Sequence, residues 1–406
     1  MIRLATGLAG LALLLSGAVH AAGSCTPAPG ELLRYEPAPI EAGRRVLRVG
    51  SGEKLATPGA AAQLARDGDA ILIEAAEYAG TRAVWKQNRL LIRGVNGRPH
   101  LIAGDKLAQD KAIWVFNGED VVVENIEFSG ARIPSHNGAG IRAQGRSLTV
   151  RAGFFHDSDM GILSSNDPQQ EVVVEFSEFA RNGHDNGKAH NLYIGSIKRF
   201  ELRHSSSYGA RTGHLVKSRA AQNLIAYNRL ADVPAGPSSY ELDFPRSTDS
   251  TVIGNLILQS EASPNGAMLS YGAEDKGRAP LGRLRVAWNT FYSLRSQPVF
   301  IFNHSPEQAL VVNNLFAGAA GRDVRGPAEA HGNLTVAASA FVDPAGLNFA
   351  PRDGALQTRQ DSASGLATPA DLSAEFEYVH PTAARPRSPA GRAVPGAFAP
   401  CDISGS

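Results

Sequence analysis

Three segments of the chain, each 24 residues after the last, carry polar side chains at matching positions: 190–195, 214–219 and 238–243. Stacked as neighbouring strands about 4.8 Å apart, they would send alternate side chains to opposite faces. The inward side chains would be Leu192, Val216 and Tyr240, followed by Ile194, Ser218 and Leu242. The outward ones would be Tyr193, Lys217 and Glu241 in one column, with Gly195, Arg219 and Asp243 beside it.

The outward side chains are of the types that move protons and bind anions. Five residues are predicted to be catalytic: Lys217, His214, Tyr193, His190 and Arg219. Lys217 or His214 could remove a proton, Tyr193 or His190 could donate one, and Arg219 could neutralise a carboxylate. These are the requirements of β-elimination in a uronate polysaccharide, where the C5 proton leaves and the leaving oxygen is protonated.

The same face should supply the substrate contacts, and for these we predict Asn191, Glu241, Asp243 and Arg211. Glu241 beside Lys217 would favour the protonated amine and so oppose its use as a base, unless a cation occupies Glu241. The two carboxylates, Glu241 and Asp243, could hold Ca²⁺, because hard oxygen ligands suit that ion. No calcium-loop spacing is present, and no other cofactor is indicated.

Two other interpretations of this face remain open. Lys217 with Glu241 and Arg219 with Asp243 could be surface ion pairs, which contribute only about 0–1 kcal/mol each. Alternatively, Glu241 and Asp243, roughly 6.6–6.8 Å apart along a strand, could be the acid and base of a glycoside hydrolase. Asp157 and Asp159 form a second pair of this spacing.

Charge places the candidate site in the middle of the chain. The net charge of +1 does not favour nucleic acid or an anionic membrane as a partner. Between residues 181 and 219, however, eight basic residues face two acidic ones, a surplus of six. Five of the 11 histidines lie between residues 156 and 214, and the loop at 183–188 would rise beside the polar face.

A repeat predicts the elements that position these side chains. Short β-rich strings centre on residues 125, 152, 176, 204, 228, 255, 289 and 314, at steps of 24 to 34 residues. Repeats of this length with alternating strands predict a β-solenoid. Asn125, Asn228, Asn255, Asn289 and Asn314 should form a hydrogen-bonded ladder up the stack. An amphipathic helix at 60–66 should cap the N-terminal end.

The opening of the repeat region resembles a known group. Val49-Gly50-Ser51-Gly52, the helix and Gly68-Asp69-Ala70-Ile71-Leu72-Ile73 are similar to the start of bacterial proteins of the pectate-lyase-like superfamily. This resemblance implies an all-β chain, a single right-handed parallel β-helix over about residues 46–345. The superfamily includes lyases, hydrolases, epimerases and proteins without known activity. Lys217-Ser218 resembles alginate and chondroitin lyases of β-helix type, but residues 240–243 lack their arginine and histidine.

The ends of the chain predict export. Residues 1–21 have the basic start, apolar run and small-residue end of a signal peptide, and no segment has the roughly 20 apolar residues of a membrane helix. Residues 22–45 would form an N-terminal extension and residues 346–406 an irregular C-terminal segment. Cys25 and Cys401 are predicted to form a disulfide, which suits an oxidising compartment.

The sequence therefore predicts a secreted or periplasmic monomer that acts on an anionic, uronate-type polysaccharide by lyase chemistry. A hydrolase or epimerase on the same scaffold is one alternative. A polysaccharide-binding or envelope scaffold protein without catalysis is the other.

Overall fold

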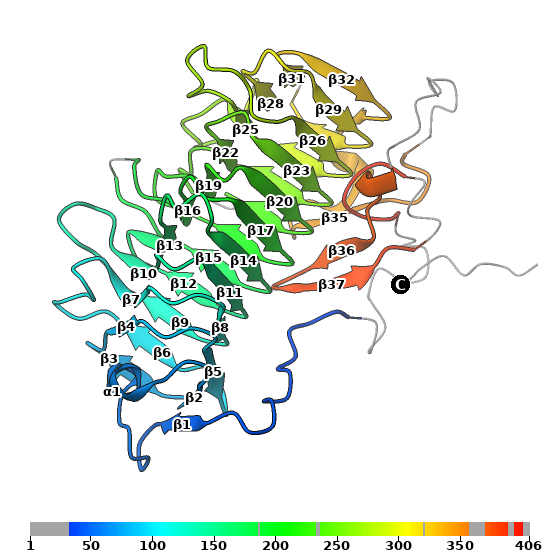
Figure 1. Cartoon of the computed structure of the whole chain (residues 1–406). Coiled ribbons are helices and arrows are strands. Elements are labelled where there is room, and N and C mark those ends of the chain that lie inside the picture. The colour runs from blue at the N-terminus through cyan, green and yellow to red at the C-terminus, as the bar shows by residue number, and fades with distance from the viewer. Residues whose placement is uncertain are drawn as a thin grey trace, which may run out of the picture.

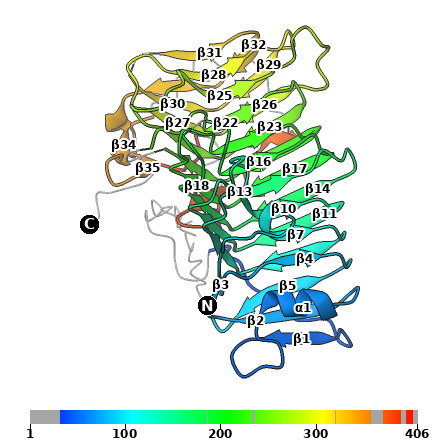
Figure 2. The same ribbon diagram turned by 90° about the vertical axis from the view of Figure 1, so that its left-hand side faces the viewer.

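The structure is a computed structural model that describes residues 32–185, 187–232, 236–319, 321–356, 370–388 and 394–400. Three long parallel sheets are stacked side by side along one axis (Figures 1 and 2). Each coil of the chain adds one strand to each sheet in turn. This arrangement confirms the predicted parallel β-helix.

The twelve-stranded sheet contains β1 (Val46–Val49), β2 (Ala70–Glu74), β5 (Leu91–Val95), β8 (Val121–Glu124), β11 (Ser147–Arg151), β14 (Glu171–Glu175), β17 (Arg199–Arg203), β20 (Gln222–Ala226), β23 (Asp249–Ile253), β26 (Leu284–Ala287), β29 (Ala309–Val312) and β32 (Ala328–His331). The ten-stranded sheet contains β4 (Ala83–Trp85), β7 (Ala112–Phe116), β10 (Ala139–Ala143), β13 (Met160–Ser164), β16 (Leu192–Ile194), β19 (Val216–Ser218), β22 (Leu242–Phe244), β25 (Ala267–Tyr271), β28 (Val299–Asn303) and β31 (Arg322–Arg325). The eleven-stranded sheet contains β3 (Glu77–Ala79), β6 (His100–Ile102), β9 (Glu127–Ser129), β12 (Phe154–His156), β15 (Glu178–Ala180), β18 (Ser206–Tyr208), β21 (Arg229–Ala231), β24 (Leu256–Gln259), β27 (Thr290–Ser293), β30 (Leu315–Gly318) and β33 (Leu334–Val336).

The core is a set of columns in which like side chains stack between coils. Phe128, Phe155 and Phe179 form one such column, with ring centroids 4.9 Å apart at each step and rings within 5° of parallel. This separation matches the spacing of neighbouring strands. Because each inward side chain packs on its equivalents in the next coils, the repeat in the sequence specifies the stacking in space.

The predicted asparagine ladder is confirmed for four of its five members. The Asn228, Asn255 and Asn289 side chains each donate to the amide oxygen of the next ladder asparagine, at 2.9–3.0 Å, and Asn314 continues the chain of bonds to Asn333. Asn125 is not a member. It occupies the preceding turn position, with φ +55°, and its side chain donates to Gly94 and Gly97 carbonyls. Asparagine tolerates this left-handed conformation better than most residues.

Both ends of the solenoid are covered. Helix α1 (Pro58–Leu64) packs over the first coil as the predicted cap, and the Thr57 side chain accepts from the Ala60 N–H at its N-terminus. Near the other end, β34 (Phe341–Asp343) and β35 (Asn348–Pro351) form an antiparallel pair after a 3₁₀ turn at Ala338–Ala340.

The C-terminal segment is more regular than predicted. After a 3₁₀ turn at Ala370–Leu372, β36 (Phe376–Val379) and β37 (Ala383–Pro386) form an antiparallel hairpin, orange-red in Figure 1. The segment lies along the solenoid, as expected, because Trp288 Nε1 donates to the Leu372 carbonyl at 2.7 Å. Leu33 of the N-terminal extension forms a β-bridge with Ala384.

The signal segment at 1–21 and both cysteines, Cys25 and Cys401, lie outside the described residues. Within the described ranges no helix has the length and apolar character needed to cross a membrane.

Candidate functional site

The polar column lies on the outer face of the ten-stranded sheet, but its third member differs from the prediction. Tyr193 of β16 pairs with Lys217 of β19, as expected. Lys217 then pairs with Asp243 of β22, 26 residues later, and not with Glu241. The turn before β22 holds two more residues than a 24-residue coil allows. Leu242 consequently takes the inward position that was predicted for Tyr240.

The predictions made for Glu241 as an outward residue are therefore wrong. Its side chain is fully buried, and neither carboxylate oxygen has a hydrogen-bond partner among the described residues. Burial, reinforced by the negative charge of Asp232, raises its pKa well above the ordinary value. Glu241 cannot join Asp243 in a surface Ca²⁺ site or as an acid–base pair, because it faces the interior.

The outer face instead carries a chain of ion pairs over three coils. Lys217 Nζ lies 2.9 Å from Asp243 Oδ2 and 3.7 Å from Glu274 Oε1. Arg219 makes two hydrogen bonds to Glu274, at 2.8 and 2.7 Å, and a third to the Tyr193 hydroxyl oxygen, at 2.7 Å. Glu274 was not predicted, since it stands in the loop after β25, outside any repeated string. Both ion pairs expected from the sequence thus exist with different carboxylate partners.

Two carboxylates around Lys217 are pushed in opposite directions. Burial raises the pKa of Asp243, and the charge of Lys217 only partly opposes this. Burial also acts on Glu274, but the hydrogen bonds and charge of Arg219, together with Lys217, outweigh it and lower the pKa. Asp243 is therefore the carboxylate more ready to accept a proton, a division typical of acid–base sites.

His190 and His214 lie behind this cluster, with their rings stacked 4.4 Å apart. Burial, followed by the charges of Lys217 and Arg219, lowers the pKa of His214 to about 3. Burial and His214 lower that of His190 well below its ordinary value. Both rings are thus neutral near pH 7.

The backbone assigns the tautomers of these rings. His190 Nδ1 accepts from the His214 N–H at 2.9 Å, and His214 Nδ1 accepts from the Tyr240 N–H at 3.2 Å. Each neutral ring therefore carries its proton on Nε2. His214 Nε2 lies 3.5 Å from Asp243 Oδ2, so its proton points toward that carboxylate. This geometry favours positioning of Asp243 over the predicted role of His214 as a base.

Two of the predicted substrate contacts lie away from the cluster. The Asn191 side chain is buried and donates to Ser207 Oγ and the Tyr208 carbonyl, both at 3.0 Å, so it holds a turn together. Arg211 lies 3.5 Å from Asp157, on the side of the eleven-stranded sheet. Asp159, the partner of Asp157 in the second predicted pair, accepts backbone N–H groups and shapes the loop before β10.

Arg142 is a member of the outer column that the sequence analysis missed. It occupies the position two strands below Tyr193, through the register Arg142–Leu163–Tyr193. Its Nε has no hydrogen-bond partner, and no ion pair of Arg142 exists among the described residues. Burial lowers the pKa of this guanidinium. An unpaired, partly buried cation of this kind suits an anionic ligand.

Loops rise beside the same face. His184, in the loop predicted to wall the site, stacks on His136 from the loop before β10, with ring centroids 3.5 Å apart. Thr212 Oγ1 donates to the His184 carbonyl at 2.8 Å. Contacts between loops of different coils hold this side of the polar face.

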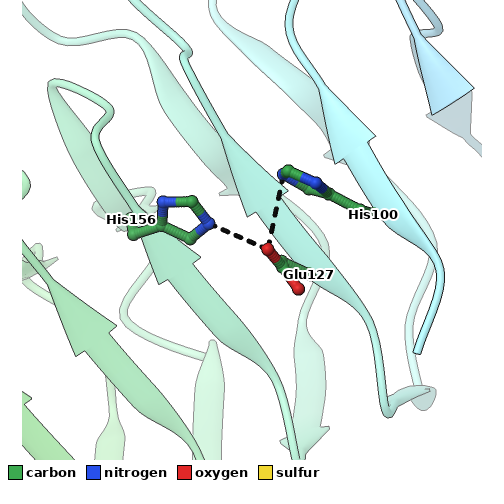
Figure 3. A group of neighbouring side chains, drawn as sticks. All are labelled: His100, Glu127 and His156. Carbon is green, nitrogen blue, oxygen red and sulfur yellow. Dashed lines mark hydrogen bonds and ion pairs between the residues drawn. The ribbon is translucent and has the colours of Figure 1, made fainter. Parts of the chain in front are cut away.

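A second polar cluster lies on the eleven-stranded sheet and includes a group of metal-ligand type. His100, Glu127 and His156 come from β6, β9 and β12 and point toward one another (Figure 3). Their ligand atoms all lie within 4.8 Å of one another. His156 stands in a histidine-rich interval of the sequence, whereas His100 and Glu127 carried no signal.

Fold and register together define the class of the molecule as a right-handed parallel β-helix with a polar face on one sheet. No family model matches the chain, and no curated protein matches it. Among solved structures it is similar to pectate lyase Pel9A, with 15% identity and a TM-score of 0.55, over 88% of this chain and 98% of that one. At this identity the likeness shows the fold alone.

Two further solved structures are more distant. ORF18 of Geobacillus virus E2 is 12% identical, with a TM-score of 0.36, over 66% of this chain and 53% of that one. A mutant of the PL6 family alginate lyase AlyGC is 11% identical, with a TM-score of 0.35, over 67% and 43%. No argument rests on either of them.

Proposed function

We propose that the chain acts on a uronate-type polysaccharide along the outer face of the ten-stranded sheet, and that the reaction is β-elimination. The observation that carries this proposal is the column of Arg142, Tyr193 and Lys217, in which a free cation, a hydroxyl and an amine follow one another. The similarity in fold to a protein named as a pectate lyase is consistent with it.

Arg142 would anchor the sugar carboxylate, because it is the cation of the column without an ion-pair partner among the described residues. Arg219, the predicted anchor, is occupied by Glu274 and Tyr193. Since its guanidinium donates to the Tyr193 oxygen, the phenol hydrogen remains free to point away from it. Arg219 would then orient Tyr193 as the acid.

Lys217 would be the base, with Asp243 as the group that activates it. Transfer of the Lys217 proton to Asp243 across their 2.9 Å contact leaves a neutral amine beside the sugar. Burial, which raises the pKa of Asp243, favours this neutral pair. The amine then takes the C5 proton, the C–H electrons form the C4=C5 double bond, the C4–O bond breaks, and Tyr193 protonates the leaving oxygen.

The test is the ultraviolet absorbance of unsaturated product with purified protein on a panel of uronate polysaccharides. We expect Lys217→Ala and Tyr193→Phe to lower kcat by about 10²- to 10⁴-fold, as for loss of an acid or base. Lys198→Ala is the matched control, because Lys198 is an exposed lysine paired with Glu171. Absence of unsaturated product on every polymer would refute the elimination.

A glycoside hydrolase is the second candidate, favoured by the opposite pKa shifts of Asp243 and Glu274. It would release reducing ends without ultraviolet absorbance, and Glu274→Gln would abolish that release. An epimerase would change the sugar composition without shortening the chain. Retention of polymer on the face with no product of any kind would favour the scaffold alternative.

Export is part of the proposal and rests on the sequence of residues 1–21. Sequencing the N-terminus of protein recovered from the periplasm or medium of an expressing bacterium tests it. A mature start shortly after Ala21 would support export, and an intact Met1 would contradict it. A monomeric state and the Cys25–Cys401 disulfide stay predictions of the sequence.

A further inference from the structure

The eleven-stranded sheet presents two imidazoles and a carboxylate at one point of its outer face. Glu127 Oε1 lies 3.0 Å from His156 Nε2 and 3.5 Å from His100 Nε2 (Figure 3). The three side chains come from β6, β9 and β12, which are adjacent strands of three successive coils. We propose that they bind a divalent transition-metal ion of the zinc class. This inference does not rest on the proposed function.

The distances fit such an ion. Zinc binds imidazole nitrogen at about 2.0–2.1 Å and carboxylate oxygen at about 2.0–2.2 Å, so ligand atoms around a tetrahedral ion stand about 3.3 Å apart. The 3.0 and 3.5 Å contacts from Glu127 bracket this value. An ion would take the place of the hydrogen bonds that His100 now makes with Ser129 Oγ at 2.7 Å and with Glu127.

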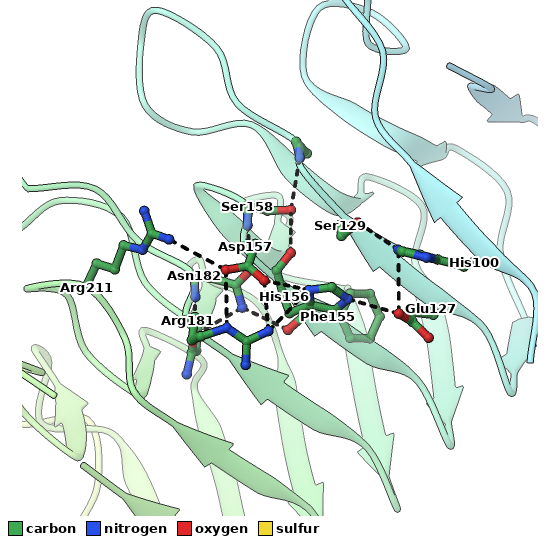
Figure 4. Close-up of polar contacts among 12 residues, drawn as sticks. His100, Glu127, Ser129, Phe155, His156, Asp157, Ser158, Arg181, Asn182 and Arg211 are labelled. Carbon is green, nitrogen blue, oxygen red and sulfur yellow. Dashed lines mark hydrogen bonds and ion pairs between the residues drawn. The ribbon is translucent and has the colours of Figure 1, made fainter. Parts of the chain in front are cut away.

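A second carboxylate orients one of the ligands. Asp157 Oδ2 lies 2.7 Å from Nδ1 of His156, on the side of the ring away from Glu127 (Figure 4). A carboxylate can only accept, so Nδ1 carries the hydrogen and the Nε2 lone pair faces Glu127 and His100. Metal-bound histidines commonly have this carboxylate behind them.

Two arginines hold Asp157 in place. Arg181 donates to both of its oxygens, at 3.2 and 2.8 Å, and Arg211 lies 3.5 Å from Oδ1 (Figure 4). Arg181 Nη2 is also 3.5 Å from His156 Nδ1, but this contact is much longer than the 2.7 Å bond to Asp157. The geometry thus gives Arg211, predicted as a substrate contact, a part in positioning Asp157.

Ligand type and exposure define the metal class. Two nitrogens and one oxygen suit zinc, cobalt or nickel and not Ca²⁺, which prefers oxygen ligands throughout. The side chains of His100, Glu127 and His156 are 23%, 23% and 13% exposed, so an ion can enter from solvent. Three protein ligands leave at least one position for water, and the bound ion would tie three coils together.

Calorimetric titration of zinc chloride into the full chain tests the proposal, with chelator-treated protein that carries no polyhistidine tag. We expect one zinc ion per chain, no such binding in His156→Ala, and at least tenfold weaker binding in Glu127→Gln. Asp157→Asn should weaken binding by about 10- to 100-fold, the usual effect of removing a supporting carboxylate. His331→Ala, which removes a histidine from β32 at the far end of the solenoid, should bind like the wild type.

Two further measurements separate loss of a ligand from loss of the fold. Circular dichroism should show the wild-type β spectrum in Glu127→Gln, a change that preserves side-chain shape. Zinc should raise the Tm of the wild type and of His331→Ala but not that of His156→Ala. Equal zinc binding by wild type and His156→Ala, or no binding by the wild type at about 100 μM zinc, would overturn the proposal. Because no polysaccharide is present, neither result depends on catalysis.

Discussion

Asp232 is buried beside the coil of the candidate site, and we predict that Asp232→Asn stabilises the protein above pH 7. Its side chain is only 1% exposed. Burial raises its pKa from 3.8 to about 7, and hydrogen bonds from Ser238 and Ser260 only partly oppose this. The folded protein therefore holds a proton here that the unfolded chain releases.

The hydrogen bonds of Ser260 lead to the same conclusion by a count of protons. Ser260 Oγ lies 2.7 Å from the Gly236 carbonyl oxygen and 2.9 Å from Asp232 Oδ2. The hydroxyl has one hydrogen, and the carbonyl can only accept it. The contact with Asp232 is then satisfied when the carboxyl itself carries a proton, and an asparagine NH₂ group can take that place.

The magnitude follows from the shift. A rise from 3.8 to about 7 corresponds to about 4 kcal/mol at about 1.4 kcal/mol per pH unit. Because the folded pKa lies above the unfolded one, stability falls as the pH rises from about 4 to about 7, and the whole penalty remains above that. Glu241, whose pKa burial and Asp232 also raise, adds a penalty of the same sign.

Urea denaturation at intervals from pH 4 to pH 8 measures this effect. We expect Asp232→Asn to match the wild type near pH 4 and to exceed it by about 3–4 kcal/mol at pH 8. Asp105→Asn is the control, since Asp105 is exposed, and its difference from wild type should not vary with pH. Equal destabilisation by Asp232→Asn at every pH would refute the reasoning.

Three other changes test the frame and the polar face. Asn255→Ala should lower the free energy of unfolding by about 3 kcal/mol in urea, because it leaves the Asn228 N–H and the Ile225 carbonyl unpaired. Thr57→Ala removes the N-terminal cap of α1 and should cost about 1 kcal/mol by the same measurement. Glu274→Gln releases Arg219 from its anionic partner and should lower the calorimetric Kd for a uronate oligosaccharide several-fold.

The fold could be predicted because its determinants are local and repeated. Strand alternation and a coil length near 24 to 28 residues are visible in the sequence, and stacking follows from them. Asn125 shows the limit of that reasoning. It resembles the ladder asparagines in context, yet it stands one position earlier, where the backbone turns with positive φ. A string of letters does not distinguish a turn residue from its neighbour.

The candidate site was predicted in part because two of its three coils have equal length. Tyr193 and Lys217 are paired as expected, whereas the longer turn before β22 moves Asp243 into the place assigned to Glu241. A slip of two residues preserves strand alternation, so the hydrophobic pattern alone does not reveal it. The slip changes which carboxylate meets the amine. Glu274 escaped for another reason, since it reaches the face from a loop.

The His100, Glu127 and His156 cluster shows what a register-based search omits. His100 and Glu127 share one column of the sheet, but His156 pairs in register with Ser129, in the next column. The three side chains meet because imidazole and glutamate are long enough to reach diagonally across a sheet, where strand neighbours lie about 7–8 Å apart. Candidate sites on a β-helix therefore have to be sought along diagonals as well as columns. Such a search needs only the coil boundaries, which for these three coils the repeat supplies.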